Sequence, residues 1–73
     1  MKSYEDGRHV VFDGAGNAIG RIDFDEFIRD SQARLMYRID GDEVYSMDGD
    51  FLGNLISGVL QIDGRVIFRI AEE

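Results

Sequence analysis

The sequence predicts an all-β fold, a small antiparallel barrel or roll of hairpins joined by Asp-Gly turns. Three observations support this fold class: a glycine-anchored repeat, Asp-Gly dipeptides between apolar runs, and alternation of side-chain polarity within those runs. Alternation with a period of two is typical of half-buried strands. The length of 73 residues fits one domain. We therefore expect a single hairpin-repeat domain over residues 1–73, in which the polar residues 1–7 are candidates for a disordered N-terminus.

The repeat is anchored on glycine. An aliphatic residue stands three positions after each glycine, and another apolar residue stands six positions after it. The four units are Gly16 with Ile19 and Ile22, Gly41 with Val44 and Met47, Gly49 with Leu52 and Leu55, and Gly64 with Ile67 and Ile70. Repetition at one spacing indicates a repeated structural unit.

Asp-Gly dipeptides place the turns. Tight hairpins need positive φ at their central residues, which glycine adopts without steric cost and Asp tolerates. The predicted turns lie near residues 6–7, 13–17, 40–42, 48–50 and 63–64. The predicted strands lie between them, at residues 8–12, 18–24, 34–39, 43–47, 51–56, 59–62 and 65–70.

The segment 24–34 interrupts the repeat. Asp25 can cap a helix in which Phe27 and Ile28 share one face and polar residues occupy the other. We therefore expect one short helix near 25–34, and an extended β-connection is the alternative.

The fourth position after each glycine holds either glycine or an aromatic residue: Gly20, Tyr45, Gly53 and Phe68. Glycine inside a strand is destabilising unless its missing side chain serves packing. One hypothesis is that the rings of Tyr45 and Phe68 lie across Gly20 and Gly53 and fill the space. The alternative is a β-bulge at each glycine.

Composition excludes several classes of function. The net charge is −7, with 15 acidic and 8 basic residues, and the arginines are spread along the chain. Nucleic-acid binding relies on clustered Lys and Arg that neutralise phosphates, so we expect no nucleic-acid partner. The absence of cysteine excludes disulfides, thiolate zinc sites and cysteine nucleophiles. No apolar run resembles a signal peptide or a membrane span, so we expect a cytoplasmic protein with no membrane partner.

Each candidate for chemistry has a simpler structural explanation. Calcium would need six to eight oxygens in one loop, whereas Asp40–Asp42 and Asp48–Asp50 flank a predicted strand and fit turn chemistry. The glycines of 14–20 precede a predicted strand, whereas a phosphate-binding loop precedes a helix. His9 has no second histidine near it, and we expect it on the surface of a strand.

The remaining candidates are also explained structurally. Ser3, Ser31, Ser46 and Ser57 lie outside any nucleophile-elbow pattern. The aromatic residues Tyr37, Tyr45, Phe51 and Phe68 could form a base-stacking platform, but we expect them to pack in the core because no basic groove accompanies them. We therefore expect no enzyme activity, no catalytic or cofactor-binding residues and no metal site.

One resemblance follows from the unit 37–45 (YRIDGDEVY) and the segment 48–55 (DGDFLGNL). These segments resemble a loosely defined group of small bacterial proteins that repeat a Gly-x-x-apolar-Gly-x-apolar hairpin, described as a fourfold "β-flower". The resemblance extends over most of residues 11–70 and implies a fold but no function. The segment 24–34 departs from the simple repeat.

The expected function is a non-enzymatic protein-interaction or structural module that self-associates. Small domains without disulfides have marginal cores and often gain stability by oligomerisation. The chain has one lysine, Lys2, and no proline, so its sheet edges lack the usual guards against pairing. We expect a homodimer or higher oligomer whose contact tightens with salt, and an unidentified protein partner is also compatible. A calcium- or small-ligand-binding accessory domain is the alternative.

Overall fold

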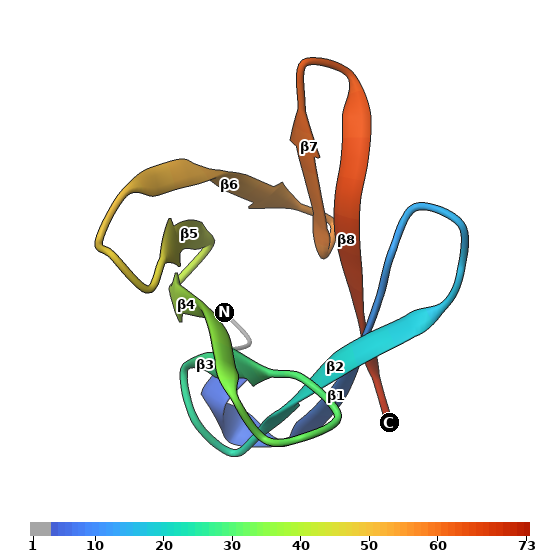
Figure 1. Cartoon of the computed structure of the whole chain (residues 1–73), viewed down its shortest axis with the longest axis vertical. Coiled ribbons are helices and arrows are strands. Elements are labelled where there is room, and N and C mark those ends of the chain that lie inside the picture. The colour runs from blue at the N-terminus through green and yellow to red at the C-terminus, as the bar shows by residue number, and fades with distance from the viewer. Residues whose placement is uncertain (1–3) are drawn as a thin grey trace.

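The computed structural model describes residues 4–73 as a closed antiparallel barrel of eight strands (Figure 1). The elements are η1 (Tyr4–Asp6), a 3-10 helix, followed by β1 (Arg8–Phe12), β2 (Ala18–Asp23), β3 (Phe27–Arg29), β4 (Leu35–Asp40), β5 (Glu43–Ser46), β6 (Phe51–Ile56), β7 (Val59–Ile62) and β8 (Arg65–Glu72). Each strand pairs with its neighbours in the chain, and β8 closes the barrel against β1. The prediction of an all-β barrel of hairpins is confirmed.

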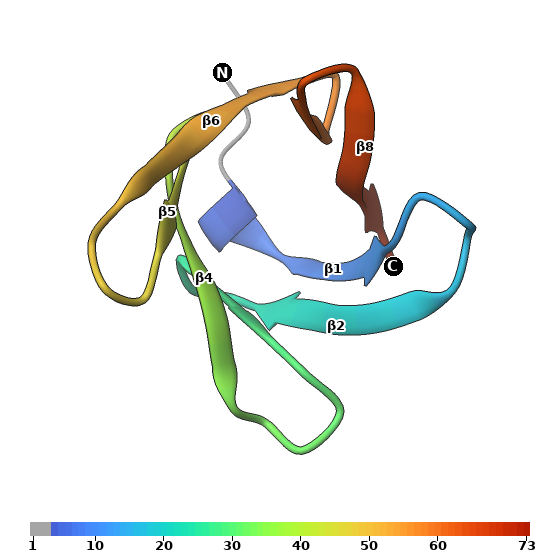
Figure 2. The same ribbon diagram turned by 45° about the horizontal axis from the view of Figure 1, so that its top comes forward.

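Four hairpins make up the barrel: β1–β2, β3–β4, β5–β6 and β7–β8. Their tips point away from a common centre in different directions, like petals (Figure 2). Short connections at residues 24–26, 41–42 and 57–58 join each hairpin to the next. Of the N-terminal segment 1–7, residues 1–3 lie outside the described residues and residues 4–6 form η1.

The helix expected near 25–34 is wrong, and the extended alternative is confirmed. Asp25 Oδ1 does accept the N–H of Phe27, as a helix cap would, but the chain then extends as β3 and pairs with β4. Asp30 Oδ1 accepts the N–H of Arg34 and closes a turn. Turns of this kind compete with helix formation. Asp25 therefore forms a turn between β2 and β3, and Asp30 forms a turn between β3 and β4.

The second unit of the repeat begins at Ala33, and not at Gly41 as the glycine spacing predicts. Each of the four hairpin tips has a residue with positive φ at the equivalent position: Gly16 (89°), Ala33 (65°), Gly49 (93°) and Gly64 (78°). In the last tip, Asp63 also has a positive φ (53°). Ala33 therefore takes the place that we assigned to Gly41. Gly41 instead lies in the connection between β4 and β5.

The core follows the corrected repeat. The sixth position after each tip residue is buried, at Ile22, Ile39, Leu55 and Ile70. The preceding strand of each hairpin also contributes one buried apolar residue: Val11, Ile28, Val44 or Leu60. With Phe68, these are the nine buried apolar residues of the described chain, residues 4–73. Each hairpin thus supplies the same pair of side chains, which gives the core a pseudo-fourfold arrangement.

A β-bulge occurs in every hairpin, at the third position after the tip residue. The strand registers skip one residue each time: Ile19, Met36, Leu52 and Ile67. The bulge alternative is thus confirmed beside both Gly20 and Gly53. The aromatic-rescue hypothesis is wrong for Tyr45, whose ring packs against Phe51 with centroids 5.6 Å apart.

The fourth position after the corrected tips is Gly20, Tyr37, Gly53 and Phe68. Glycine-bearing hairpins therefore alternate with aromatic-bearing ones around the barrel. Phe68 is fully buried, Tyr37 packs against the core, and their ring centroids are 5.1 Å apart. The two rings share the interior because the other two hairpins contribute no side chain at this position.

Candidate interaction surface

A row of outward-facing side chains crosses strands β3 to β6. The registers pair Phe27 with Arg38, Arg38 with Tyr45, and Tyr45 with Phe51. Neighbouring residues on the same strands are buried, as Ile28, Ile39 and Val44 show. Because side chains alternate between the two faces of a strand, the paired set lies on the outside of the barrel. We name Phe27, Arg38, Tyr45 and Phe51 the aromatic row.

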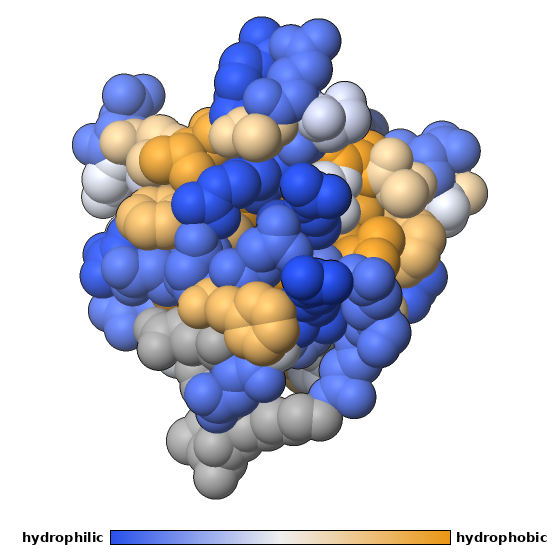
Figure 3. Space-filling model, turned by 90° about the horizontal axis from the view of Figure 1, so that it is seen from below, coloured by the Kyte–Doolittle hydropathy of each residue, from blue (hydrophilic) through white to orange (hydrophobic). Residues whose placement is uncertain are grey.

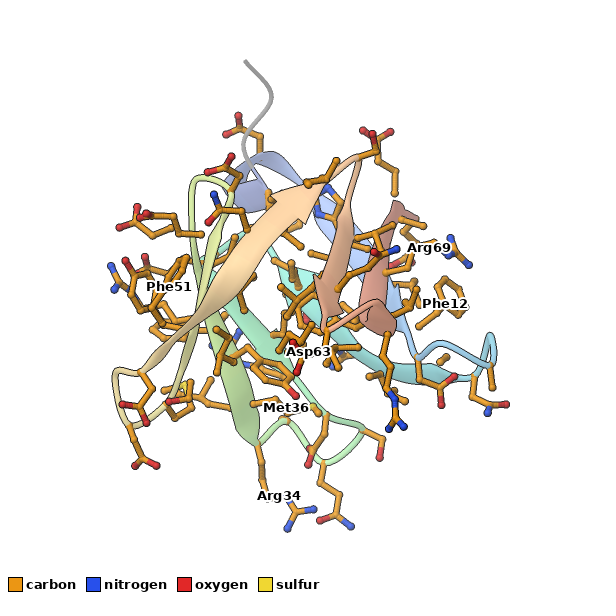
Figure 4. The ribbon with its side chains drawn as sticks, turned by 90° about the horizontal axis from the view of Figure 1, so that it is seen from above. Phe12, Arg34, Met36, Phe51, Asp63 and Arg69 are labelled. Carbon is orange, nitrogen blue, oxygen red and sulfur yellow. The ribbon has the colours of Figure 1, made fainter. Side chains whose placement is uncertain are left out.

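Three side chains of the aromatic row, those of Arg38, Tyr45 and Phe51, contact one another. The rings of Tyr45 and Phe51 meet edge to face, at an interplanar angle of 64°. The Arg38 guanidinium lies 5.9 Å from the centroid of the Tyr45 ring. Phe51 is 55% exposed, and Figure 4 shows it on the outer side of the barrel. Preformed ring contacts of this kind lower the entropy lost when a partner binds.

Carboxylates surround the row and neutralise its arginine. Arg38 Nε lies 3.3 Å from Glu26, and Arg38 Nη2 lies 3.9 Å from Asp40. The Tyr45 hydroxyl donates a hydrogen bond of 3.2 Å to Glu43. This bond raises the pKa of Tyr45, because it would be lost to an ionised phenolate, and desolvation adds to the shift. The row therefore presents neutral aromatic surface with an acidic rim.

Two of the hairpin tips carry an aspartate whose side chain is hydrogen-bonded to the backbone. Asp13 Oδ1 accepts the N–H groups of Ala15 and Asn17, and Asp30 makes the equivalent bonds in the next hairpin. Hydrogen bonds to the carboxylate lower the pKa of Asp13 and of Asp30 below the usual value of 3.8. The carboxylates of Asp13 and Asp30 therefore stabilise turns, and a bound ligand is not needed to explain their presence in the tips.

We predict acid-sensitive stability from these two aspartates. A carboxyl with a lowered folded-state pKa stabilises the fold above its unfolded value and loses that contribution as the pH falls through the folded value. The free energy of unfolding should therefore decline below about pH 3.8. In urea melts, the double variant Asp13→Asn with Asp30→Asn, which retains an acceptor oxygen, should show a shallower decline. An identical decline in parent and variant would contradict this assignment.

The acidic triplets lie at opposite ends of β5, as expected. Asp40 ends β4 and Asp42 lies in the β4–β5 connection, whereas Asp48 and Asp50 belong to the β5–β6 tip. In the described part of the chain, no three His, Asp or Glu side chains form a group that could hold a metal ion.

We predict that calcium leaves stability unchanged. Since a cation that binds the native state raises stability by mass action, the melting temperature should be the same in excess chelator and in millimolar calcium. A rise of several degrees on adding calcium would contradict the turn-only explanation of these aspartates.

His9 is placed differently from the prediction. It is buried, and its ring meets that of Tyr4 edge to face with centroids 5.3 Å apart. Burial, together with the charge of Asp42, raises the pKa of Tyr4. The expected surface position is therefore wrong: η1 folds back over β1 and covers the histidine.

The other candidate residues lie in turns and strands. Ser31 and Ser57 lie in turns, the Ser46 hydroxyl accepts the N–H of Asp50 in a tip, and Ser3 lies outside the described residues. Gly14 and Gly16 precede strand β2 and Gly20 lies within it, so a strand follows the turn, as predicted.

The aromatic row is the feature that the sequence did not indicate. Tyr37 and Phe68 do pack inward as expected, but Tyr45 and Phe51 face outward, which corrects the expectation for that pair. If the second hairpin is aligned on Ala33 instead of Gly41, Tyr37 takes the repeat position of Phe68 and Tyr45 does not. This alignment distinguishes the inward-facing Tyr37 from the outward-facing Tyr45.

Comparison with protein-family models, with curated proteins and with solved structures finds no match for this chain. Within residues 4–73, no helix is long and apolar enough to cross a membrane. Function must therefore be inferred from the surface itself. On the face shown in Figure 3, hydrophilic residues predominate and apolar side chains form separate patches between them.

Proposed function

We propose that this protein is a non-enzymatic interaction module that self-associates through the aromatic row. The observation that carries the proposal is the exposed edge-to-face pair Tyr45–Phe51 with Arg38 beside it. Aromatic residues and arginine are enriched in protein interfaces and among the residues that dominate binding energy. A row of them on a small acidic domain is typical of a contact surface.

The route to self-association differs from the one that composition suggested. The composition favours association through unguarded sheet edges. The barrel has no such edge, because it closes on itself and each strand is paired on both sides. The proposal therefore rests on the outer face, where Leu35 and Met47 add to the exposed apolar surface of this half of the barrel.

A small-ligand-binding role is the second candidate. Strands β2 and β3 pair only at Arg21 and Arg29, and the gap beside this junction forms a hollow of about 400 Å³. Its lining mixes apolar and polar groups: Val10, Ala18, Ile19, Gly20, Arg21, Asp30, Ser31 and Glu73. We rank it second because the hollow is open to solvent, whereas ligand sites usually enclose most of the ligand.

We further propose that the chain belongs with the β-flower group of hairpin-repeat proteins. The support is the repeat of one hairpin four times, with a positive-φ residue at each tip and a bulge three residues later. This assignment concerns the fold and adds nothing to the functional proposal.

The test of the functional proposal is a pair of matched variants on one strand. Phe51 begins β6 inside the aromatic row, whereas Ile56 ends β6 outside it and is 76% exposed. We expect Phe51→Ser to shift sedimentation toward the monomer mass of 8.3 kDa, and Ile56→Ser to leave the parent's association unchanged. Equal association of parent and Phe51→Ser, with both folded by circular dichroism, would contradict the proposal.

A further inference from the structure

Two arginines on β8 differ from the others in their surroundings. Arg8, Arg21, Arg29, Arg34 and Arg38 each lie within 4 Å of a carboxylate. Arg65 and Arg69 have no such partner among the described side chains of residues 4–73, and both are exposed. In a chain of net charge −7, these two cations are the uncompensated ones of the described surface.

One of these arginines lies against an aromatic ring, and an exposed apolar side chain lies on the same strand. The Arg69 guanidinium lies 4.7 Å from the centroid of the Phe12 ring on the adjacent strand β1, and Val66 is 40% exposed. A cation stacked on a ring is held in place for contact with an anion. We name Phe12, Arg65, Val66 and Arg69 the β8 patch.

The β5–β6 tip carries the opposite charge beside similar apolar groups. Its exposed side chains are Met47, Asp48, Asp50 and Phe51, and no arginine of the described residues pairs with either aspartate. Backbone bonds fix its shape, since Ser46 N–H donates to the Asp50 carbonyl and Gly49 N–H to the Ser46 carbonyl. The two carboxylates are therefore presented on a rigid hairpin end.

We propose that the β5–β6 tip of one copy docks on the β8 patch of a second copy. Two unpaired aspartates beside exposed Met47 and Phe51 complement two unpaired arginines beside Phe12 and Val66, and complementary charge selects partner and register. This inference rests on the proposed self-association, since Phe51 belongs both to the tip and to the aromatic row.

The position of the two surfaces fixes the geometry of the assembly. Phe51 lies on one side of the barrel, and Phe12 and Arg69 lie on the opposite side (Figure 4). One pair of copies then cannot satisfy both surfaces at once, so each contact leaves a free tip and a free patch. Such head-to-tail contacts build rings or open chains rather than an isologous dimer.

Exchange of charge between the two surfaces tests the proposal. Variant one carries Arg65→Glu with Arg69→Glu, and variant two carries Asp48→Arg with Asp50→Arg. In each variant alone, the two surfaces of the contact carry charges of the same sign and repel each other. We therefore expect the dissociation constant, measured by sedimentation, to rise at least about tenfold. In an equimolar mixture, every contact between the two variants regains opposite charges, and we expect association to return.

The control is the double variant Arg8→Glu with Arg34→Glu. Each substitution lowers the charge by two, so this control and variant one both change the net charge from −7 to −11. We expect the control to associate more tightly than variant one. Circular dichroism melts of every variant establish that each is folded, and any β8-patch variant that unfolds is replaced by Arg65→Gln with Arg69→Gln, for which a weaker loss is expected.

Each outcome has a definite meaning. Unchanged association of variant one, or no recovery in the mixture, would overturn the head-to-tail contact and leave self-association through the aromatic row alone. A parent protein that is monomeric at all concentrations would overturn the proposed function itself. Salt is a poorer diagnostic than charge exchange, because salt screens both the net repulsion of acidic copies and the local attraction.

Discussion

The substitution Phe68→Ala is expected to cost about 3–5 kcal/mol, a large part of the stability of this domain. Phe68 is fully buried and is the largest of the fully buried side chains, and truncation of a buried phenylalanine to alanine costs about 3–5 kcal/mol. Domains have roughly 0.05–0.15 kcal/mol of stability per residue, which for 73 residues is about 4–11 kcal/mol. Loss of the ring also leaves Tyr37 without its partner in the interior. Urea or thermal melts followed by circular dichroism measure the effect.

Phe51→Ala is the matched control for this prediction. It removes a ring of the same size from an exposed position, where the loss is confined to the contact with Tyr45 and should stay below about 1.5 kcal/mol. Comparable losses in the two variants would show that Phe68 does not occupy the centre of the core.

The second large effect is expected for Gly20→Ala. A Cβ added at Gly20 would lie 2.4 Å from the carbonyl oxygen of Arg29 and 3.2 Å from its carbonyl carbon. These are backbone atoms, so the strands themselves must separate, and β2 and β3 pair only at Arg21 and Arg29. We expect a loss of about 2–3 kcal/mol in the free energy of unfolding, at the upper end of the cost of overpacking.

Gly7→Ala is the control for the glycine variant. The nearest atom to its added Cβ is His9 Cε1 at 3.9 Å, which is an ordinary contact. This variant should differ from the parent by less than about 0.5 kcal/mol. If Gly20→Ala melts at the same urea concentration as the parent, then Gly20 does not serve the close approach of β2 and β3.

The turns and strands could be predicted because they follow from local chemistry. The strand after Gly64 alternates as a half-buried strand does, and it forms β8. The Gly41 unit misled because Asp-Gly marks any tight turn, whether a hairpin tip or the connection between hairpins. The second hairpin tip has Ala33 at a φ of 65°. Alanine rarely adopts this conformation, so the sequence pattern does not predict it.

The segment 24–34 shows why a cap alone does not predict a helix. Asp25 and Asp30 satisfy backbone N–H groups two residues later, which is equally the start of a helix or of an Asx turn. Pairing of β3 with β4 decides between them, and that pairing depends on closure of the whole barrel.

The aromatic row could not be predicted for a similar reason. Phe27, Arg38 and Tyr45 lie on three different strands, and they form one row with Phe51 only through the strand registers. The β3–β4 and β5–β6 registers each contain a bulge that shifts the pairing by one residue, and such a shift moves side chains from one face to the other. His9 is a further case, since its burial depends on contact with Tyr4 of η1.

Light scattering of the parent protein across a dilution series tests the central claim most directly. The claim is that the outer face of this barrel is a self-association surface. At micromolar concentration and about 0.15 M salt, we expect a mean mass above 8.3 kDa that falls toward that value on dilution. A mass that stays at 8.3 kDa throughout the series would contradict the claim and identify the protein as a monomer.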